Sequence, residues 1–597
     1  MESVEAVYRR LLGASQARAE VERRRHIGLG YAKLVDFLAG VIAAGVLVHT
    51  RGPFNLLLIP LAIFVVLVVV HDRVLRRLAK LVRVTEFYAR GLARIENQWP
   101  GTGESGDRFF DAAHPYARDL DLFGKGSLFE LLSTARTRMG EETLARWLLA
   151  AAAPEEVKAR QAAVVEMQER VTLRERLFAA GEDVRAGVHP EELAAWGEAK
   201  PEFQSRGLPW VLAFLAALWL ASIVFWGITR NWDLALLMSL INYAVSYRLN
   251  RRVSASADAV EKAAEDLKVL AEVLAIMEGE GFAAERLKGL RARLDTRHIA
   301  ASAAVKKLER VYDWLEDRRN GFVTLFNAFV FYAAQLTMAA ERWRGRFGPE
   351  IRGWLTAVGE FEALGALAGY AYEHPADVMC ELAGGPAYFE AEDLAHPLLP
   401  AGKAVGNDLK LGSGEPQLIV ISGPNMAGKS TFLRGVGLNA VLAQAGAPVR
   451  AKRLRMSSLT VGASICVLDS LAGGVSRFYA EIQRLKVLSD LAEGPAPLLF
   501  LLDELLSGTN SHDRFEGTQF VVRDLVRKGA IGLVTTHDLA LAAIPETMEG
   551  AARNCHFEDA IEEGKLKFDY RLRAGIVQTS NALKLMQAVG LHVADSG

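Results

Sequence analysis

A nine-residue loop, residues 423–431, constrains the fold of this chain more than any other segment. It reads GPNMAGKST and fits the pattern G-x-x-x-x-G-K-[ST], which cradles nucleotide phosphates. An apolar run typical of a strand, residues 417–422, precedes the loop, and residues 431–442 follow with the composition of a helix. In this order the backbone N–H groups of the loop and the positive end of the helix dipole face phosphate oxygens. The sequence therefore predicts a nucleotide site in an α/β domain.

Two residues of the loop have expected roles in phosphate and metal binding. Lys429 would reach the β- and γ-phosphates of the nucleotide, and the Ser430 hydroxyl would ligate Mg²⁺. The expected nucleotide-binding residues are Gly423, Pro424, Asn425, Met426, Ala427, Gly428, Lys429, Ser430 and Thr431.

Two further apolar runs end in residues suited to hydrolysis. Residues 497–502 lead into Asp503, which suits Mg²⁺, usually through water, and Glu504, which could orient and deprotonate the attacking water. Residues 531–536 lead into His537, which could hydrogen-bond the γ-phosphate. Parallel strands bring their carboxyl ends to one edge of a sheet, where ligands bind. The alternative for Asp503 and Glu504 is a strand that simply ends in surface acids, and the alternative for His537 is a structural role.

A second glycine loop precedes a predicted helix over residues 478–492. Its Ser476 is placed to cap that helix, and a helix N-terminus is another anion-binding device. Taken in isolation, the loop is a helix cap.

Composition narrows the expected partners. The chain carries 70 basic and 71 acidic residues, so its formal net charge is -1. A nucleic-acid site would therefore have to be a local patch. The cysteines, Cys380, Cys466 and Cys555, match no metal-binding spacing or disulfide framework, which indicates thiols in a reducing compartment.

Two long apolar segments predict membrane spans. Residues 54–70 carry no charge, and residues 209–228 have tryptophans near both ends, as at a bilayer interface. Each has a weaker companion, residues 37–48 and residues 234–247 respectively, so we expect two helical hairpins. The alternative is a pair of buried hydrophobic hairpins within a large soluble protein.

Flanking charges predict the orientation of both hairpins. Basic residues cluster outside the hairpins, at residues 23–25, 73–83 and 248–252, whereas each short turn carries one arginine. By the positive-inside rule both hairpins enter from the cytoplasm and return, which places the nucleotide domain on the cytoplasmic side of the cell (inner) membrane. Residues 322–338 are a fifth apolar candidate. One more span would move the phosphate loop away from cytoplasmic ATP, so we expect a buried core helix there.

The chain is expected to combine helical and α/β parts. Long helical periodicity indicates a helical core with lever arms, and β-rich runs alternating with helices indicate a C-terminal α/β domain. The expected domains are residues 1–97 with the first hairpin, 118–200 as the first part of the helical core, 201–252 with the second hairpin, 253–375 as the second part of the helical core and lever, and 376–597 as the P-loop ATPase domain with a short helical tail.

The order of four motifs resembles the ATPase domain of the MutS family of DNA mismatch repair proteins, which are ABC-type ATPases. The motifs are GPNMAGKST, GVSRFYAEI, LLFLLDELLSGTN and TTHD, and most other phosphate loops lack the Pro-Asn-Met of the first. More weakly, residues 118–200 and 253–372 resemble the helical core of the family.

This resemblance implies hydrolysis of ATP to ADP and phosphate, with Mg²⁺, in a homodimer of ATPase domains arranged head to tail. Hydrolysis would be coupled to movement of the helical levers. Ser476 would reach across to the γ-phosphate bound by the partner subunit, and the implied catalytic residues are Glu504, His537 and Lys429. The residues implied to act within one subunit are Asn425, Lys429, Ser430, Asp503, Glu504 and His537.

Departures from the family pattern bear on the substrate. Residues 1–117 hold no G-x-F-Y-E-like motif that reads mismatches, and the second hairpin stands roughly where relatives carry DNA-clamping arms. Ala404 or Val405 stands where some relatives have an aromatic residue that stacks on adenine. DNA is thus an expected partner by resemblance alone. The alternatives are half of an ABC transporter, against which the missing L-S-G-G-Q signature counts, and a mechanical or scaffolding membrane ATPase without nucleic acid.

Overall fold

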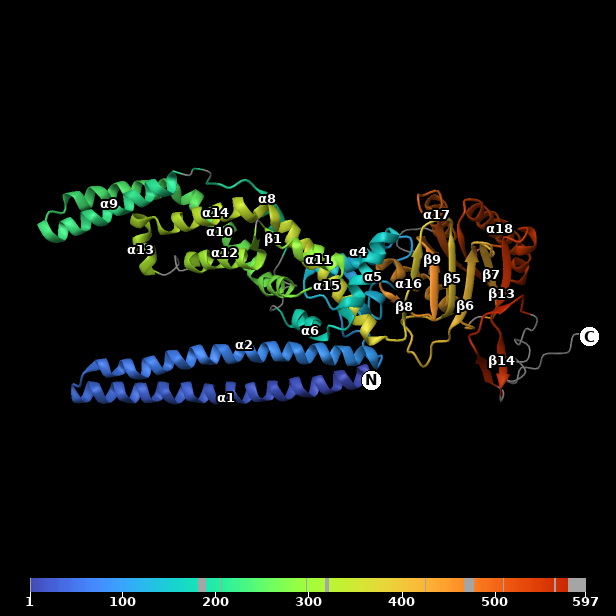
Figure 1. Ribbon diagram of the computed structural model, residues 1–597, viewed down its shortest axis with the longest axis horizontal. Coiled ribbons are helices and arrows are strands. Elements are labelled where there is room, and N and C mark those ends of the chain that lie inside the picture. Colours follow the sequence, from blue (N-terminus) through green and yellow to red (C-terminus); the bar gives the residue numbers. More distant parts are fainter. Residues whose placement is uncertain are drawn as a thin grey trace, which may run out of the picture. The chain divides into compact units, whose positions relative to one another are not determined.

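The computed structural model describes residues 2–180, 189–203, 205, 207–296, 298–316, 321–424, 426–465, 477–507, 509–562 and 565–577. The chain divides into two compact units. The first comprises Met1–Thr134, Leu144–Glu175 and Leu364–Gly597, and the second comprises Ala135–Thr143 and Arg176–Ala363. Helices dominate the N-terminal half, and a mixed α/β domain forms the C-terminal part (Figure 1). The predicted combination of helical and α/β parts is confirmed.

The first hairpin consists of two long antiparallel helices, α1 (Val4–Thr50) and α2 (Leu58–Ile95) (Figure 1). Arg51 ends α1 in the left-handed conformation with φ of 52°, and the short 3-10 helix η1 (Phe54–Leu57) leads into α2. The segment 37–48, predicted as a short separate span, is part of the continuous helix α1. The charged residues Lys33 and Asp36, which precede this segment, do not interrupt the helix.

A buried ion pair fixes the base of this hairpin. Arg94 of α2 donates from both Nε and a terminal nitrogen to the two carboxylate oxygens of Glu373, at 2.6 Å each. Glu373 ends α15 (Ile351–Glu373), and its side chain is fully buried. The Tyr8 hydroxyl of α1 donates to the same carboxylate at 3.4 Å. Both helices of the hairpin are thus tied to the end of α15.

Between the first hairpin and residue 180, four shorter α-helices lie in the first unit or across its boundary with the second. They are α3 (Leu128–Leu132), α4 (Arg138–Leu149), α5 (Pro154–Gln168) and α6 (Val171–Ala179). The second unit contains α8 (Pro190–Glu198), α9 (Leu208–Thr229), α10 (Asp233–Gly279), α11 (Glu285–Ala292), β1 (Asp295–Thr296), β2 (Ile299–Ala300), α12 (Ala301–Glu316), α13 (Gly321–Val330), α14 (Tyr332–Phe347) and η4 (Gly348–Glu350).

The second hairpin consists of α9 and the first turns of α10. The segment 234–247 therefore begins a helix of 47 residues that continues far beyond the apolar stretch. Neutral polar contacts cross the hairpin. Asn242 is fully buried, and its amide donates to the carbonyls of Leu215 and Phe329 at 3.3 and 2.8 Å. The Trp219 indole donates to the Ser239 hydroxyl at 2.8 Å.

By length and composition, three helical segments within the described ranges could cross a membrane: Val4–Thr50, Phe54–Ile95 and Leu208–Thr229. In the most apolar 18-residue window of each segment at most 17% of the residues are buried, and among the exposed apolar side chains are Ile42, Val66 and Trp210. Soluble proteins rarely expose contiguous apolar surface of this extent.

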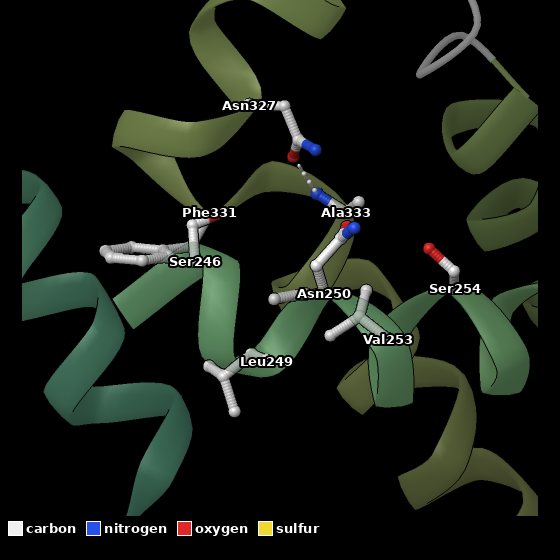
Figure 2. Close-up of a pocket in the computed structure, with 9 residues that line it drawn as sticks. Ser246, Leu249, Asn250, Val253, Ser254, Asn327, Phe331 and Ala333 are labelled. Atoms are coloured by element: carbon white, nitrogen blue, oxygen red, sulfur yellow. Dashed lines mark hydrogen bonds between the residues drawn. The ribbon is translucent and has the colours of Figure 1, made fainter. Parts of the chain in front are cut away.

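The segment 322–338 is not one helix, which corrects the prediction of a single core helix. Phe331, with φ of 55°, separates α13 from α14. The Asn327 side chain accepts a hydrogen bond from the Ala333 N–H at 2.8 Å, which satisfies a free donor at the start of α14 (Figure 2). A small polar pocket lined by Ser246 and Asn250 of α10 adjoins this break. The prediction that this segment is buried holds for the first half of α14, where most residues are buried.

In the described part of the C-terminal domain, two larger sheets are accompanied by the two-stranded pairs β3–β8 and β14–β15. The larger has the order β10–β11–β12–β7–β13–β16, parallel from β10 to β13, with β16 antiparallel. The smaller has the order β4–β9–β5–β6. The strands are β3 (Val378–Met379), β4 (Glu381–Ala383), β5 (Tyr388–Leu394), β6 (Asn407–Gly412), β7 (Leu418–Ser422), β8 (Pro448–Val449), β9 (Arg453–Ser457), β10 (Thr460–Ser464), β11 (Leu498–Asp503), β12 (Ile531–Thr536), β13 (Ala552–His556), β14 (Asp559–Glu562), β15 (Lys565–Phe568) and β16 (Arg573–Ala574).

The helices α16 (Lys429–Ala445), α17 (Arg477–Leu491) and α18 (Ser511–Arg527) and the 3-10 helix η6 (Leu539–Thr547) complete this domain. Every residue of β7 and β12 is buried, as are the first five residues of β11. Strands of a parallel sheet that is covered on both faces appear in a sequence as unbroken apolar runs. That is why these three strands could be predicted.

Candidate nucleotide site

The phosphate loop joins β7 to α16, as the sequence predicts. Gly423 follows β7 with φ of 148°, and a Cβ there would lie only 2.8 Å from the Phe557 carbonyl oxygen, so this position requires glycine. Gly428 precedes α16 with φ of 98°. Lys429 and Ser430 therefore occupy the first turn of the helix. Asn425 lies outside the described residues.

Asp503 meets the loop at the carboxyl edge of the sheet. The Ser430 hydroxyl donates to one carboxylate oxygen of Asp503 at 2.6 Å, and the Thr535 hydroxyl donates to the other. Thr535 is the register partner of Asp503 on β12. A serine hydroxyl and a carboxylate side by side offer the oxygen ligands that Mg²⁺ prefers. Among the residues that the structure describes, no cluster of three or more His, Cys, Asp or Glu could hold a metal ion instead.

The Lys429 ammonium lies beneath the loop with the proposed water-activating acid nearby. Its Nζ donates to the carbonyls of Gly423 and Pro424 at 2.8 and 3.0 Å and lies 4.0 Å from Glu504 Oε1. Burial lowers the pKa of Lys429, while the Glu504 and Asp503 carboxylates raise it. The close partners of the ammonium are neutral carbonyls, so an anionic phosphate oxygen would bind it more strongly.

Glu504 stands between Lys429 and His537. His537 Nδ1 lies 3.2 Å from Glu504 Oε1, and both side chains are partly exposed. Glu504 has φ of 49°, and Leu506 has φ of 53°. A left-handed conformation at a residue other than glycine costs roughly 1 kcal/mol or more and is found preferentially at functional sites. The turn after β11 is thus held in a conformation that its side chains alone would not select.

Hydrogen bonds from three sides hold this turn. The Glu504 N–H donates to the Thr535 carbonyl at 3.1 Å. The Leu506 N–H donates to the buried carboxylate of Glu481 on α17 at 2.7 Å. Arg514 of α18 donates to the carbonyls of Leu506, Ser507 and Thr509, at 3.2 Å each.

A cavity of about 690 Å³ adjoins the loop. Lys429, Ser430 and Glu504 line one part, and the apolar part is lined by Leu394, Leu399, Val405, Phe557 and Tyr570. An apolar compartment next to a phosphate loop has the character of a site for a nucleotide base.

Tyr570 is a candidate site residue that sequence reasoning missed. Its ring lies 3.0 Å from the position that a Cβ at Gly428 would take. Asn407 fixes the segment around it, because its amide donates to the Tyr570 carbonyl at 3.0 Å and its oxygen accepts from the Leu572 N–H at 2.7 Å. In the sequence, Ala404 or Val405 stands where some relatives of the resembled family have an aromatic residue. The structure brings one from beyond β15, and no local pattern in the sequence signals it.

His396 also lines the cavity. Burial, with smaller contributions from the Arg434 and Arg450 guanidinium groups, lowers its pKa from an ordinary value of 6.5 to about 4. Its Nδ1 accepts a hydrogen bond from the Leu398 N–H at 3.2 Å, so the neutral ring carries its proton on Nε2. The cavity therefore has a neutral histidine at physiological pH.

The structure brings together Lys429, Ser430, Asp503, Glu504 and His537, as predicted. Met426 is 84% exposed, so its side chain makes little contact with its own domain. Ser476 lies outside the described residues.

Comparison with known proteins identifies this domain. A family model described as MutS domain V matches residues 419–594. The DNA mismatch repair protein MutS of Brevibacillus brevis is 35% identical over 207 residues, which cover 34% of this chain and 23% of that protein. The MutS protein of Natronomonas pharaonis is 33% identical over 235 residues, covering 36% and 26%. The DNA mismatch repair protein MutS 2 of Haloarcula marismortui is 35% identical over 211 residues, covering 31% and 22%.

The C-terminal domain of this chain therefore belongs to the MutS family. The matched region spans only about a quarter of the length of each of these relatives.

Proposed function

We propose that this protein is a membrane-anchored ATPase that hydrolyses ATP to ADP and phosphate in a head-to-tail homodimer, moving its helical lever arms. The observation that carries the proposal is the convergence at one sheet edge of the Ser430–Asp503 hydrogen bond with Lys429 and Glu504. Membership in a family of ATPases supports the assignment.

The residues present fit Mg²⁺ and a nucleoside triphosphate. Ser430 and Asp503 would hold the metal, since both offer hard oxygen ligands on adjacent elements. When bound, Mg²⁺ neutralises negative charge on the phosphates. Lys429 would exchange its carbonyl partners for phosphate oxygens, and Tyr570 would face the base across the apolar part of the cavity.

Glu504 is the residue proposed to orient water and accept its proton. His537, at 3.2 Å, would hold the Glu504 carboxylate or donate to the γ-phosphate. Glu504 follows the last residue of β11 and has a left-handed backbone. Within one subunit the assigned roles are therefore metal binding by Ser430 and Asp503, phosphate binding by Lys429, and proton transfer by Glu504.

The dimer is proposed because a single domain leaves apolar side chains uncovered around the site. Besides Met426, the start of α17 exposes Phe478, Tyr479 and Ile482 by between 36 and 54%. A second ATPase domain would cover them, and the proposed role of Ser476, which immediately precedes α17, is to contact the γ-phosphate in that partner's site.

The membrane anchor is proposed from the two hairpins. Outward apolar side chains on α1, α2 and α9 would be covered by lipid, and the basic residues at their aqueous ends would place the ATPase domain in the cytoplasm, at the inner membrane. Extraction with carbonate tests this. The protein should stay with membranes and be released only by detergent, and release by carbonate would contradict it.

DNA is the substrate proposed from the names of the relatives, in mismatched or other structured form. The alternative is a mechanical, scaffolding or ABC transporter-like ATPase without nucleic acid, which the near-neutral charge of the chain favours. The test is steady-state ATPase activity of the purified protein with Mg²⁺ or with EDTA, and with homoduplex, mismatched or branched DNA over a range of salt. Loss of activity in EDTA is expected. If no DNA binds or stimulates at low salt, the DNA proposal is wrong and the alternative stands.

A further inference from the structure

A segment preceding α3 touches elements on two sides of the nucleotide site. We name residues 113–122 the strap. Its peptide backbone pairs with the edge strand of the larger sheet, because the Ala463 N–H of β10 donates to the Pro115 carbonyl at 2.9 Å. The strap lies in the same compact unit as the ATPase domain.

On one side the strap holds the helix that carries Lys429 and Ser430. Leu120 is fully buried against α16, where a Cβ at Gly437 would lie only 2.6 Å from its side chain. Only glycine permits this close approach. One turn earlier, Arg434 donates to the Asp121 carboxylate at 2.9 Å. The position of α16 is therefore fixed by packing and by an ion pair.

On the other side one buried carboxylate, that of Asp119, holds the end of β10 and α17. Its two oxygens accept hydrogen bonds from the Ile465 N–H at 2.7 Å and from the Arg484 guanidinium at 2.6 Å. Arg484 also donates to the carbonyls of His114 and Ala463, at 2.8 and 3.1 Å. The Asp119 side chain is 3% exposed, so the ion pair is shielded from solvent.

The position of α17 also determines the position of the turn that carries Glu504. Glu481 precedes Arg484 by one helical turn, and its buried carboxylate accepts the Leu506 N–H. Glu504 and Leu506 both have left-handed backbones, so the turn depends on such external bonds to keep its shape. A shift of α17 would move the Leu506 N–H and with it Glu504.

We propose that Asp119 is a positioning residue for ATP hydrolysis, acting through Arg484 and Glu481 on the turn of Glu504. The inference rests on the proposed function and deepens it. ATP binding depends on α16, which Leu120 and Asp121 hold separately. Loss of the Asp119 charge should therefore lower the rate of ATP hydrolysis and leave the affinity for ATP unchanged. A residue with a merely structural role would not produce this difference.

The experiment compares Asp119→Asn, Glu481→Gln and the double variant in full-length protein in nanodiscs. Asp119→Asn retains an oxygen that can accept from the Ile465 N–H but loses the charge that Arg484 requires. We expect kcat to fall about tenfold to a hundredfold, as for displacement of a catalytic group by about 1 Å. The Kd of a non-hydrolysable ATP analogue should change by less than about threefold, because α16 is undisturbed. The double variant should lose little more than the worse single variant, since both act on one path.

The matched control is Glu373→Gln, which also neutralises a buried carboxylate paired with an arginine in the same unit. It should lower the melting temperature without lowering kcat. The inference is overturned if Asp119→Asn hydrolyses ATP at the wild-type rate, or if its kcat falls no more than that of the control. A wild-type protein that binds or hydrolyses no ATP would overturn the proposed function and this inference with it, whereas an active wild type with an unaffected Asp119→Asn variant overturns the inference alone.

Discussion

Two clusters of buried or partly buried charge in the same unit differ in how completely their groups are paired. At the base of the first hairpin, the Glu373 carboxylate is fully buried and receives two 2.6 Å hydrogen bonds from Arg94 as well as one from Tyr8. At the nucleotide site, the Glu504 carboxylate lies 4.0 Å from Lys429 and 3.2 Å from His537 and keeps about a third of its surface exposed.

This difference in pairing distinguishes a carboxylate that stabilises the fold from one that is available for chemistry. A buried carboxylate that is fully paired has no spare capacity for a ligand, and removing its charge leaves an unpaired arginine in the interior. A loosely paired carboxylate on a left-handed residue can accept a proton or a water without first breaking strong bonds. The first cluster should therefore govern stability and the second should govern catalysis.

The largest expected effect tests the catalytic side. Glu504→Gln keeps the size of the side chain but removes its basicity, so kcat for ATP should fall about 10²- to 10⁴-fold. Because the Glu504 side chain is partly exposed and is 4.0 Å from the Lys429 ammonium, the melting temperature should stay near that of the wild type. Steady-state hydrolysis and thermal unfolding on one preparation measure both. Normal hydrolysis by this variant would remove Glu504 from its proposed role.

The stability side is tested by Glu373→Gln. The change leaves Arg94 buried without its counter-charge and should lower the free energy of unfolding by about 3–5 kcal/mol. The rate of ATP hydrolysis per folded molecule should be unchanged. The matched control replaces both partners, Arg94→Met with Glu373→Leu, and should restore most of the lost stability because no charge remains buried. Loss of kcat in the folded fraction of either variant would contradict the division of roles.

Tyr570 should have a smaller effect, on binding alone. Tyr570→Ala removes the aromatic wall of the cavity beside Gly428 and should raise the Kd of ATP by about tenfold, the contribution of roughly one aromatic contact. Tyr570→Phe keeps the ring and should bind like the wild type. A change in kcat with an unchanged Kd would instead place Tyr570 on the catalytic side of the comparison.

The sequence predicts the part of the site that is built from local order. Lys429 and Ser430 follow a glycine loop, Asp503 and Glu504 end an apolar run, and parallel strands must bring such ends to one edge. The register of β11 on β12 then places Asp503 beside Thr535. These relations depend on strand periodicity and on the direction of the sheet, and both are visible in the order of residues.

Contacts between distant segments could not be predicted in this way. Tyr570 reaches Gly428 because of the path that the chain takes after β15, and Asp119 contacts Arg484 although 365 residues separate them in the sequence. The break at Phe331 was hidden in an apolar run, since a side-chain cap from Asn327 replaces the expected glycine or proline. Composition records none of these relations, because each depends on which surfaces meet after folding.

The last expected effect is confined to acidic pH and concerns His396, which lies in the nucleotide cavity yet should act on stability. Burial lowers its pKa to about 4 in the folded protein, against an ordinary value of 6.5. Between these two pH values the unfolded chain binds more protons than the folded protein. His396 therefore does not reduce the free energy of unfolding above pH 6.5, but reduces it as the pH falls towards 4. In His396→Asn this contribution should vanish, and the melting temperature should fall less steeply between pH 6.5 and 4 than in the wild type. Equal slopes for the two proteins would show that the ring is protonated without penalty in the folded state, and that the cavity is open enough to solvate it.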